Sequence, residues 1–228
     1  MLTAIVTGAS RGLGLALADS LADRGWRLVI DARDGVALEQ AAARLRARTE
    51  VVALAGDVAD PAHREALVGA ADKIDLLVNN ASTLGPSPLP PLARHPLDEL
   101  EHVYRVNAIA PLALMQAVLP RLAEGARIVN VTSDAAVEPY EGWGGYGSSK
   151  AALEQLTAVF AAEQSALRVY AVDPGDMNTR LHQEAYPGED ISDRPAPSQS
   201  VPGLLALIEG DLPSGRYSAA ALAAGARA

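Results

Sequence analysis

A tyrosine and a lysine four positions apart offer the clearest acid–base chemistry in this chain of 228 residues. Tyr146 precedes Lys150, which is one of only two lysines beside seventeen arginines. Residues i and i+4 share one face of a helix, so the ammonium would lie beside the phenol. A positive charge there lowers the pKa of a phenol and would suit Tyr146 to proton transfer near neutral pH. A surface pair on an amphipathic helix has the same spacing, so further site residues must decide between the two interpretations.

A glycine-rich segment near the N-terminus offers a second kind of chemistry, which is phosphate binding. Thr7-Gly8-Ala9-Ser10-Arg11-Gly12-Leu13-Gly14 separates an apolar strand-like run from a helical pattern. Glycines let the backbone turn tightly and approach a pyrophosphate, whose charge is met by the helix N-terminus. The segment predicts a dinucleotide site that uses Gly8, Ser10, Arg11, Gly12, Leu13 and Gly14. Glycine at a strand-to-helix turn also occurs for structural reasons alone, and this spacing differs from Gly-x-Gly-x-x-Gly.

The elements that must position these residues alternate along the chain from its first residue. Short apolar runs predict strands at Leu2–Thr7, Arg27–Asp31, Val51–Leu54, Ile74–Asn79, Ala126–Val131 and Arg168–Val172. Helical patterns lie between them at Gly12–Arg24, Val36–Arg48, Pro61–Ala71, Pro96–Leu122 and Tyr146–Gln164. Nearly continuous apolar runs are typical of strands covered on both faces. The pattern predicts a single α/β domain over residues 1–228, a Rossmann-like, doubly wound parallel sheet with helices on both faces.

Two irregular segments follow predicted strands and are expected at the ligand-binding edge of this sheet. Ser82–His95 is rich in proline, and residues 176–200 mix proline, glycine and charges. Long irregular segments at this edge are more often lids or substrate loops than linkers, so a substrate loop is expected at about 176–200. The C-terminal segment Ser218–Ala228 is rich in alanine, and the sequence does not decide whether it packs or frays.

Composition excludes several classes of protein. The net charge of −9 argues against a nucleic-acid-binding surface, and no uninterrupted apolar run has the length of a membrane span. The chain has no cysteine, so disulfides and thiolate metal sites are excluded. Histidines 63, 95 and 102 lack metal-ligand spacing, no metal site is predicted, and His182 is expected at the surface. We expect a cytoplasmic protein with neither nucleic-acid nor membrane partners.

The motifs together resemble those of the short-chain dehydrogenase/reductases. The pattern of that family is Thr-Gly-x-x-x-Gly-x-Gly, Asn-Asn-Ala-Gly, a helix asparagine, a serine, and Tyr-x-x-x-Lys. Here the corresponding residues are Thr7–Gly14, Asn79-Asn80-Ala81-Ser82, Asn107, Ser133 and Tyr146–Lys150, followed by Pro174-Gly175 and Thr179. The matches occur in the correct order and reach about Thr179. Ser82 departs from the family glycine, and we expect the site to tolerate it.

The resemblance implies a role for each matched residue. Tyr146 would exchange a proton with the carbonyl or alcohol oxygen, and Ser133 would hydrogen-bond that oxygen. Lys150 would hold the nicotinamide ribose and lower the pKa of Tyr146, and Asn107 would hold a water of the proton relay. The structural alternatives are that Ser133 caps a strand end and that Asn107 satisfies backbone groups inside its helix. Cofactor contacts are also implied for Asp57, Val58, Asn80, Ala81, Pro174, Gly175 and Thr179.

The loop after the second strand is expected to select the cofactor. Aligned on the strand end, Ala32 falls where NAD-binding relatives usually carry aspartate, and Arg33 falls where NADP-binding relatives carry a basic residue. Arg11 is a second feature of the NADP group, and two guanidiniums could grip one phosphate. Asp31 would read the NAD ribose if the register shifted by one residue. NADP(H) is therefore favoured, and NAD(H) is not excluded.

The expected function is an NADP(H)-dependent oxidoreductase, a carbonyl reductase acting on a carbonyl or secondary alcohol. The alternatives are the same reaction with NAD(H) and a non-catalytic protein that senses NADP(H). The segment Asp134–Gly145 should line the substrate pocket, and its aromatic and acidic side chains favour a polar or cyclic carbonyl. By the resemblance, the chain would form a homodimer or homotetramer through the helices Pro96–Leu122 and Ala151–Ala162.

Overall fold

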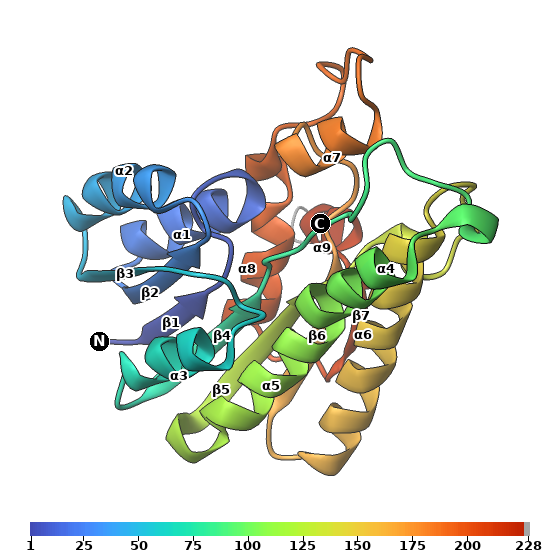
Figure 1. Ribbon diagram of the computed structural model, residues 1–228. Coiled ribbons are helices and arrows are strands. Elements are labelled where there is room, and N and C mark those ends of the chain that lie inside the picture. Colours follow the sequence, from blue (N-terminus) through green and yellow to red (C-terminus); the bar gives the residue numbers. More distant parts are fainter. Residues whose placement is uncertain (226–228) are drawn as a thin grey trace.

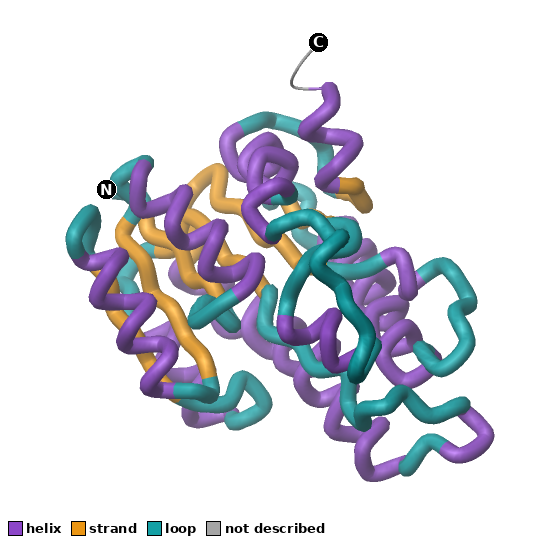
Figure 2. Tube along the Cα trace, turned by 90° about the horizontal axis from the view of Figure 1, so that it is seen from above, coloured by secondary structure: helices purple, strands orange, loops and turns teal. Residues whose placement is uncertain are grey.

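The computed structural model describes residues 1–225 and contains one seven-stranded parallel sheet with helices on both faces (Figures 1 and 2). The strand order is β3-β2-β1-β4-β5-β6-β7. The strands are β1 (Thr3–Val6), β2 (Arg27–Ala32), β3 (Val51–Ala55), β4 (Ile74–Asn79), β5 (Leu122–Val131), β6 (Arg168–Asp173) and β7 (Gly215–Ser218). This arrangement confirms the doubly wound, single-domain α/β fold.

Two apolar layers hold the helices against the sheet. The strands alternate their side chains between the faces, so neighbours such as Ile5 and Val6 enter opposite layers while both are fully buried. One layer packs against α1 (Gly12–Asp23), α2 (Gly35–Arg46), α8 (Val201–Glu209) and α9 (Ala219–Gly225). The other packs against α3 (Pro61–Gly69), α5 (Ala110–Val118) and α6 (Gly144–Glu163). Coverage on both faces explains why the central strands read as continuous apolar runs.

The helical stretch expected at Pro96–Leu122 is continuous but not uniform. It contains α4 (Leu97–Tyr104), a π-helical turn at Arg105–Ile109, α5 and a short 3₁₀ turn at Leu119–Arg121. Within residues 1–225, Leu97–Arg121 is the one helical stretch long and apolar enough to cross a membrane, with hydropathy 1.2 and 50% of its window buried inside the protein. Its buried face contributes Leu114, Met115 and Val118 to the core, as a core helix would.

The strand order places the candidate site. After β3 the chain crosses back over the sheet to β4, so β1 is flanked by β2 on one side and by β4 on the other. Connections leave β1 and β4 in opposite directions, and this opens a crevice at the carboxyl ends of the strands. The segment after β6, with α7 (Arg180–Ala185), rises above this edge at the top of Figure 1. The expected substrate loop therefore lies over the crevice.

The C-terminal part contains elements that the sequence did not predict. Helix α8 and the edge strand β7 follow the substrate loop, and β7 pairs in parallel with β6. Helix α9 packs on α8, and its first residue Ala219 is fully buried, so residues 219–225 pack rather than fray. The rest of the alanine-rich segment, residues 226–228, lies outside the described residues.

Candidate active site

A cavity of about 800 Å³ opens at the carboxyl ends of the strands and collects most of the residues expected in the site. Its lining includes Gly8, Ser10, Arg11, Gly12, Leu13, Arg33, Asp57, Val58, Asn80, Ala81, Ser133, Tyr146, Lys150, Pro174, Gly175 and Thr179. Of the predicted site residues, only Gly14 and Asn107 are not part of the lining. Residues more than 160 positions apart in the chain thus meet in one crevice.

The glycine-rich segment is held in place by the end of β4. Thr7 Oγ1 accepts hydrogen bonds from the backbone N–H of Asn80 at 2.9 Å and of Ala81 at 3.0 Å. In return, Asn80 Nδ2 donates hydrogen bonds to the carbonyl oxygens of Thr7 at 2.8 Å and Gly8 at 3.2 Å. Gly8 and Gly12 have φ values of 66° and 58°, which favour glycine. Asn80, which directly follows the neighbouring strand β4, therefore shapes this loop.

The loop suits a pyrophosphate. Helix α1 starts from Arg11 and has no side-chain cap within the described part of the chain, so its positive end faces the cavity. Gly14 has a packing role, because a Cβ there would lie 2.5 Å from Asn80 Nδ2. The cradle, the uncapped helix end and two arginines at the rim together fit a phosphorylated dinucleotide. A bound nicotinamide dinucleotide would supply or accept the hydride.

Charged residues at and after the end of β2 line the part of the cavity where the sequence predicts the adenosine. Arg11 Nη2 donates to Asp34 Oδ2 at 2.8 Å, with both side chains about half exposed. Arg33 also lines the cavity. Asp31, by contrast, is 1% exposed, with one oxygen 2.7 Å from Gly8 N and the other 3.0 Å from His63 Nε2. Both of its oxygens are occupied by the protein, which weakens the interpretation of Asp31 as the acid that reads an NAD ribose.

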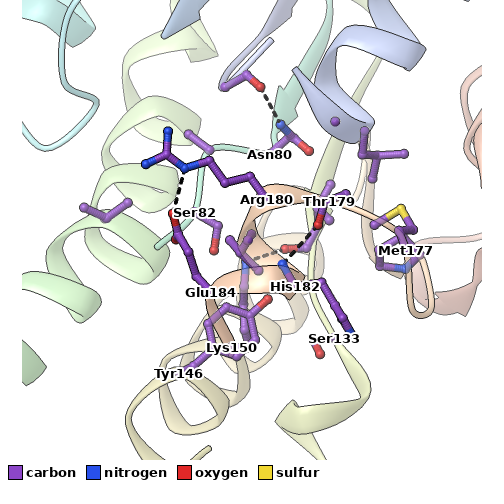
Figure 3. Close-up of a pocket in the computed structure, with 18 of the residues that line it drawn as sticks. Asn80, Ser82, Ser133, Tyr146, Lys150, Met177, Thr179, Arg180, His182 and Glu184 are labelled. Atoms are coloured by element: carbon purple, nitrogen blue, oxygen red, sulfur yellow. Dashed lines mark hydrogen bonds and ion pairs between the residues drawn. The ribbon is translucent and has the colours of Figure 1, made fainter. Parts of the chain in front are cut away.

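The Tyr146–Lys150 pair lines the same cavity and lies well below Asn80 in the view of Figure 3. Both side chains come from α6 and are buried, and Lys150 Nζ lies 5.5 Å from the centre of the Tyr146 ring. Burial lowers the pKa of Lys150 to about 7. Burial also raises the pKa of Tyr146, an effect that the nearby hydroxyls of Ser82 and Ser133 offset only in part. The pKa of Tyr146 is therefore raised and not lowered as expected, because desolvation of the buried phenol outweighs the two hydroxyls.

Ser133 has the capping role that the sequence suggested as an alternative, and it also lies at the cavity. Its hydroxyl accepts from Ala135 N at 3.2 Å and so caps a 3₁₀ turn (Asp134–Ala136) after β5. The same hydroxyl donates to Asp134 Oδ1 at 2.9 Å and lines the cavity. Ser82, the departure from the family glycine, also lines the cavity, and its hydroxyl donates to Asn107 Oδ1 at 3.1 Å. The additional side chain is therefore accommodated by a hydrogen bond.

Asn107 is fully buried in the π-helical turn and supports the loop after β4. Its Oδ1 accepts from Ser82 Oγ and from Thr83 N, while its Nδ2 donates to Thr83 O and Ser149 Oγ at 2.8 and 3.0 Å. A side-chain amide has two donors and two acceptor sites, so this one is saturated. The alternative that Asn107 satisfies backbone groups inside its own helix is therefore wrong, because the backbone groups it binds belong to Thr83 in the neighbouring loop. A relay water at Asn107 stays a prediction.

His182 is a cavity residue that sequence reasoning placed at the surface. It is 8% exposed and lines the cavity from α7 (Figure 3). Its ring centre lies 5.2 Å from that of Tyr186, with the two rings tilted by 35°. Among the described residues, its Nε2 has no hydrogen-bond partner. Trp143 also lines the cavity and packs edge-on against Tyr146 at 5.7 Å. No local sequence pattern marks His182, since only the fold brings α7 over the cavity.

The fold and the cavity define a dinucleotide-binding protein of the doubly wound α/β class. Within residues 1–225, no group of three or more histidine, cysteine, aspartate or glutamate side chains is placed to hold a metal ion. The glycine-rich loop and the buried tyrosine–lysine pair both line the cavity, so a molecule bound there would contact them.

Comparison with known proteins assigns the family. The family model described as short chain dehydrogenase matches residues 2–190. The chain is 33% identical to sepiapterin reductase of Mus musculus over 201 residues, which covers 79% of this chain and 76% of the relative. A short chain dehydrogenase structure from Pseudomonas syringae superposes with a TM-score of 0.89 at 28% identity, covering 96% and 94% of the two chains. A structure from Escherichia coli CFT073 complexed with NADPH has a TM-score of 0.86 at 27% identity, covering 96% of each. The chain belongs to the short-chain dehydrogenase family of oxidoreductases.

Proposed function

We propose that this protein is an NADP(H)-dependent oxidoreductase that interconverts a carbonyl and a secondary alcohol. The observation that carries the proposal is the cavity itself, which joins a phosphate cradle at one end to the buried Tyr146–Lys150 pair at the other. A protein that only bound the nucleotide would not need a buried phenol and a buried ammonium beside each other. Such a pair is costly to bury and serves proton transfer.

In this proposal the side chains of the chain manage the proton and the orientation of the substrate. Tyr146 gives its proton to the carbonyl oxygen in reduction and takes one from the alcohol in oxidation. Ser133, which faces the same cavity, turns its hydroxyl from Asp134 to the substrate oxygen. Lys150 is fixed by a 2.8 Å hydrogen bond to Val131 O and presents its remaining donors to the cavity, where the cofactor ribose would accept them.

The preference for NADP(H) rests on charge at the adenosine end. Arg33 and Arg11 both line this end, and guanidinium groups bind a phosphate through paired hydrogen bonds. The carboxylate of Asp31 is occupied by Gly8 and His63, so it does not compete for the ribose. The Escherichia coli neighbour with bound NADPH supports the same assignment.

The walls of the cavity favour a compact cyclic carbonyl. The ring centres of Trp143 and Tyr186 lie 6.1 Å apart, and the ring of His182 packs on Tyr186. Aromatic rings therefore line the cavity beside Tyr146. Their flat faces suit planar rings, and His182 Nε2, which has no hydrogen-bond partner among residues 1–225, suits a polar group on that ring.

We further propose a homo-oligomer in the cytoplasm that forms through α4, α5 and α6. Ile109 at the end of the π-helical turn and Val159 on α6 are large apolar side chains left 54% and 43% exposed. A mass from light scattering would distinguish a dimer from a tetramer.

The proposed function is tested by following reduced-cofactor absorbance with a panel of cyclic and acyclic ketones and alcohols, using NADPH and NADH. Tyr146→Phe should lower kcat by about two to four orders of magnitude and leave the Kd for NADPH nearly unchanged. Tyr217→Phe is the matched control, because it removes another phenol hydroxyl on the edge strand β7, outside the cavity. Full turnover by Tyr146→Phe would refute the mechanism, and NADPH binding without turnover of any substrate would favour the sensing alternative.

A further inference from the structure

A buried imidazole connects three cofactor-facing segments that are distant in the sequence. His63 lies in the first turn of α3, buried, with Nε2 3.0 Å from Asp31 Oδ2 at the end of β2. The other oxygen of Asp31 accepts from Gly8 N, in the phosphate loop, at 2.7 Å. The ring of His63 also lies against Gly56 after β3, where an added Cβ would come 2.2 Å from Nδ1. The ends of β1, β2 and β3 thus meet around one histidine.

Asp31 lies where a carboxylate would affect the choice between NAD and NADP. It lines the cavity next to Ala32 and Arg33, at the end that suits an adenosine. A free carboxylate at the end of β2 accepts a hydrogen bond from the 2′-hydroxyl of NAD, and it repels the 2′-phosphate of NADP. Asp31 is nevertheless 1% exposed and paired on both oxygens, so its charge is directed into the protein.

His63 is the residue that holds the carboxylate in this orientation. Among residues 1–225, it is the only basic side chain within 4.0 Å of Asp31. The Gly8 N–H satisfies just one oxygen, and the second would be a buried, unpaired acceptor without the imidazole. An unpaired carboxylate oxygen is costly to bury and would turn toward the cavity, where water or a ribose hydroxyl can donate to it.

We propose that His63 is a positioning residue that favours NADP(H) over NAD(H) by holding Asp31 against Gly8 and away from the adenosine ribose. The proposal rests on the proposed function only in taking a nicotinamide dinucleotide as the ligand of the cavity. It assigns selectivity to a residue outside the cavity lining, in addition to the two arginines at the rim.

The test compares Kd values for NADPH and NADH by calorimetric titration of the full-length protein. His63→Leu should weaken NADPH binding about tenfold or more, because a like charge faces the 2′-phosphate, and should leave NADH binding unchanged or tighter. His63→Gln, which can place an amide donor near the Nε2 position, should keep the selectivity of the wild type. Adding Asp31→Asn to His63→Leu should restore NADPH binding to within about threefold, because the released charge is gone.

Equal weakening of both nucleotides by His63→Leu, without rescue by Asp31→Asn, would show a purely structural role and overturn the proposal. Should His63→Leu fail to fold, Asp31→Asn alone still decides. It should change the NADPH-to-NADH affinity ratio by less than about threefold, since the charge is already directed away, whereas a larger gain for NADPH would mean that His63 does not shield it. If the wild type binds neither nucleotide, the proposed function itself fails, which separates the two outcomes.

Discussion

The ammonium nitrogen of Lys150 donates a 2.8 Å hydrogen bond to the main-chain carbonyl of Val131, and it lies 5.5 Å from the centre of the Tyr146 ring. The lysine is therefore anchored to the end of β5 and not to the phenol, although both side chains project from α6. Its stem is fully covered, with 2% of the residue exposed. This hydrogen bond holds the amino group of Lys150 at the cavity. Because the group is buried only in the folded protein, its pKa differs between the folded and unfolded states.

The first prediction concerns the pH dependence of stability. Burial lowers the pKa of Lys150 to about 7 in the folded state, whereas an unfolded lysine titrates near about 10.4. Between these values the unfolded chain binds the extra proton, so the free energy of unfolding rises with pH across this window. The contribution from Lys150 should grow by about 2 kcal/mol between pH 7 and pH 9.

Urea unfolding of the wild type and of Lys150→Met at both pH values would measure this contribution. Methionine fills a similar volume without a titrating group, so the difference between the two proteins should increase with pH in favour of the wild type. A difference that stays constant from pH 7 to pH 9 would mean that Lys150 remains charged in the folded protein. The cofactor must be left out, because its binding would add its own protonation effects.

The second prediction concerns the arginine that follows β2. Arg33→Ala should raise the Kd for NADPH about tenfold and change that for NADH by less than about twofold, because only NADPH carries the 2′-phosphate. Arg44→Ala on α2 is a suitable control, since it also removes a guanidinium but lies outside the cavity lining. Equal losses for both nucleotides would show that Arg33 does not contact the phosphate.

The third prediction concerns Asp34, which has two partners. Its Oδ2 binds Arg11, and its Oδ1 accepts from Ala37 N and caps α2, an interaction that lowers its pKa together with Arg11. Asp34→Ala should lower the melting temperature because the cap is lost, and it should tighten NADPH binding about two- to fivefold because Arg11 is released to the phosphate. The two effects therefore have opposite signs.

Asp60→Ala separates these effects. Asp60 caps α3 in the same way, through Ala62 N, but has no arginine partner among residues 1–225. The variant should lose stability and leave NADPH affinity unchanged. Differential scanning calorimetry and nucleotide titration of both variants give the comparison, and a matching loss of NADPH affinity in both would contradict the role of Arg11.

Local patterns predicted most of the fold, and the failures have physical causes. The sequence predicted strand β4 at Ile74–Asn79, as observed. A short run with an apolar centre at this point of an alternating pattern is typical of a buried strand. Strand β7 was missed because Gly-Arg-Tyr-Ser has no apolar run and forms only by pairing with β6. The π-helical turn inside the stretch expected at Pro96–Leu122 was missed as well, because Asn107 is held there by contacts with a loop twenty-four residues earlier.

The site was predictable where spacing is fixed and unpredictable where contacts are distant. Tyr146 and Lys150 share a helix, so their proximity follows from the sequence. The contact of His63 with Asp31 spans thirty-two positions and carries no local signal. The rise in the Tyr146 pKa could not be foreseen either, since it depends on burial by elements from several parts of the chain.

The fourth prediction concerns substrate binding by His182. Its Nε2 is buried without a partner in the described chain, whereas its Nδ1 lies 3.9 Å from Asp176 Oδ1 and its ring packs on Tyr186. The Nε2 is therefore available to a polar substrate group. His182→Phe keeps the stacking but removes both nitrogens. For a cyclic ketone with a second polar group, this variant should raise KM about three- to tenfold and leave the Kd for NADPH unchanged.

His102→Phe provides the control for this variant, because that histidine lies on α4 outside the cavity lining. Turnover of a ring ketone without the second polar group should respond little to His182→Phe, which distinguishes a lost substrate contact from a displaced α7. Steady-state kinetics on the two ketones with both variants makes the comparison. Equal changes in KM for both ketones would argue that His182 only packs the substrate loop, and an unaltered KM for the polar ketone would remove His182 from the substrate site.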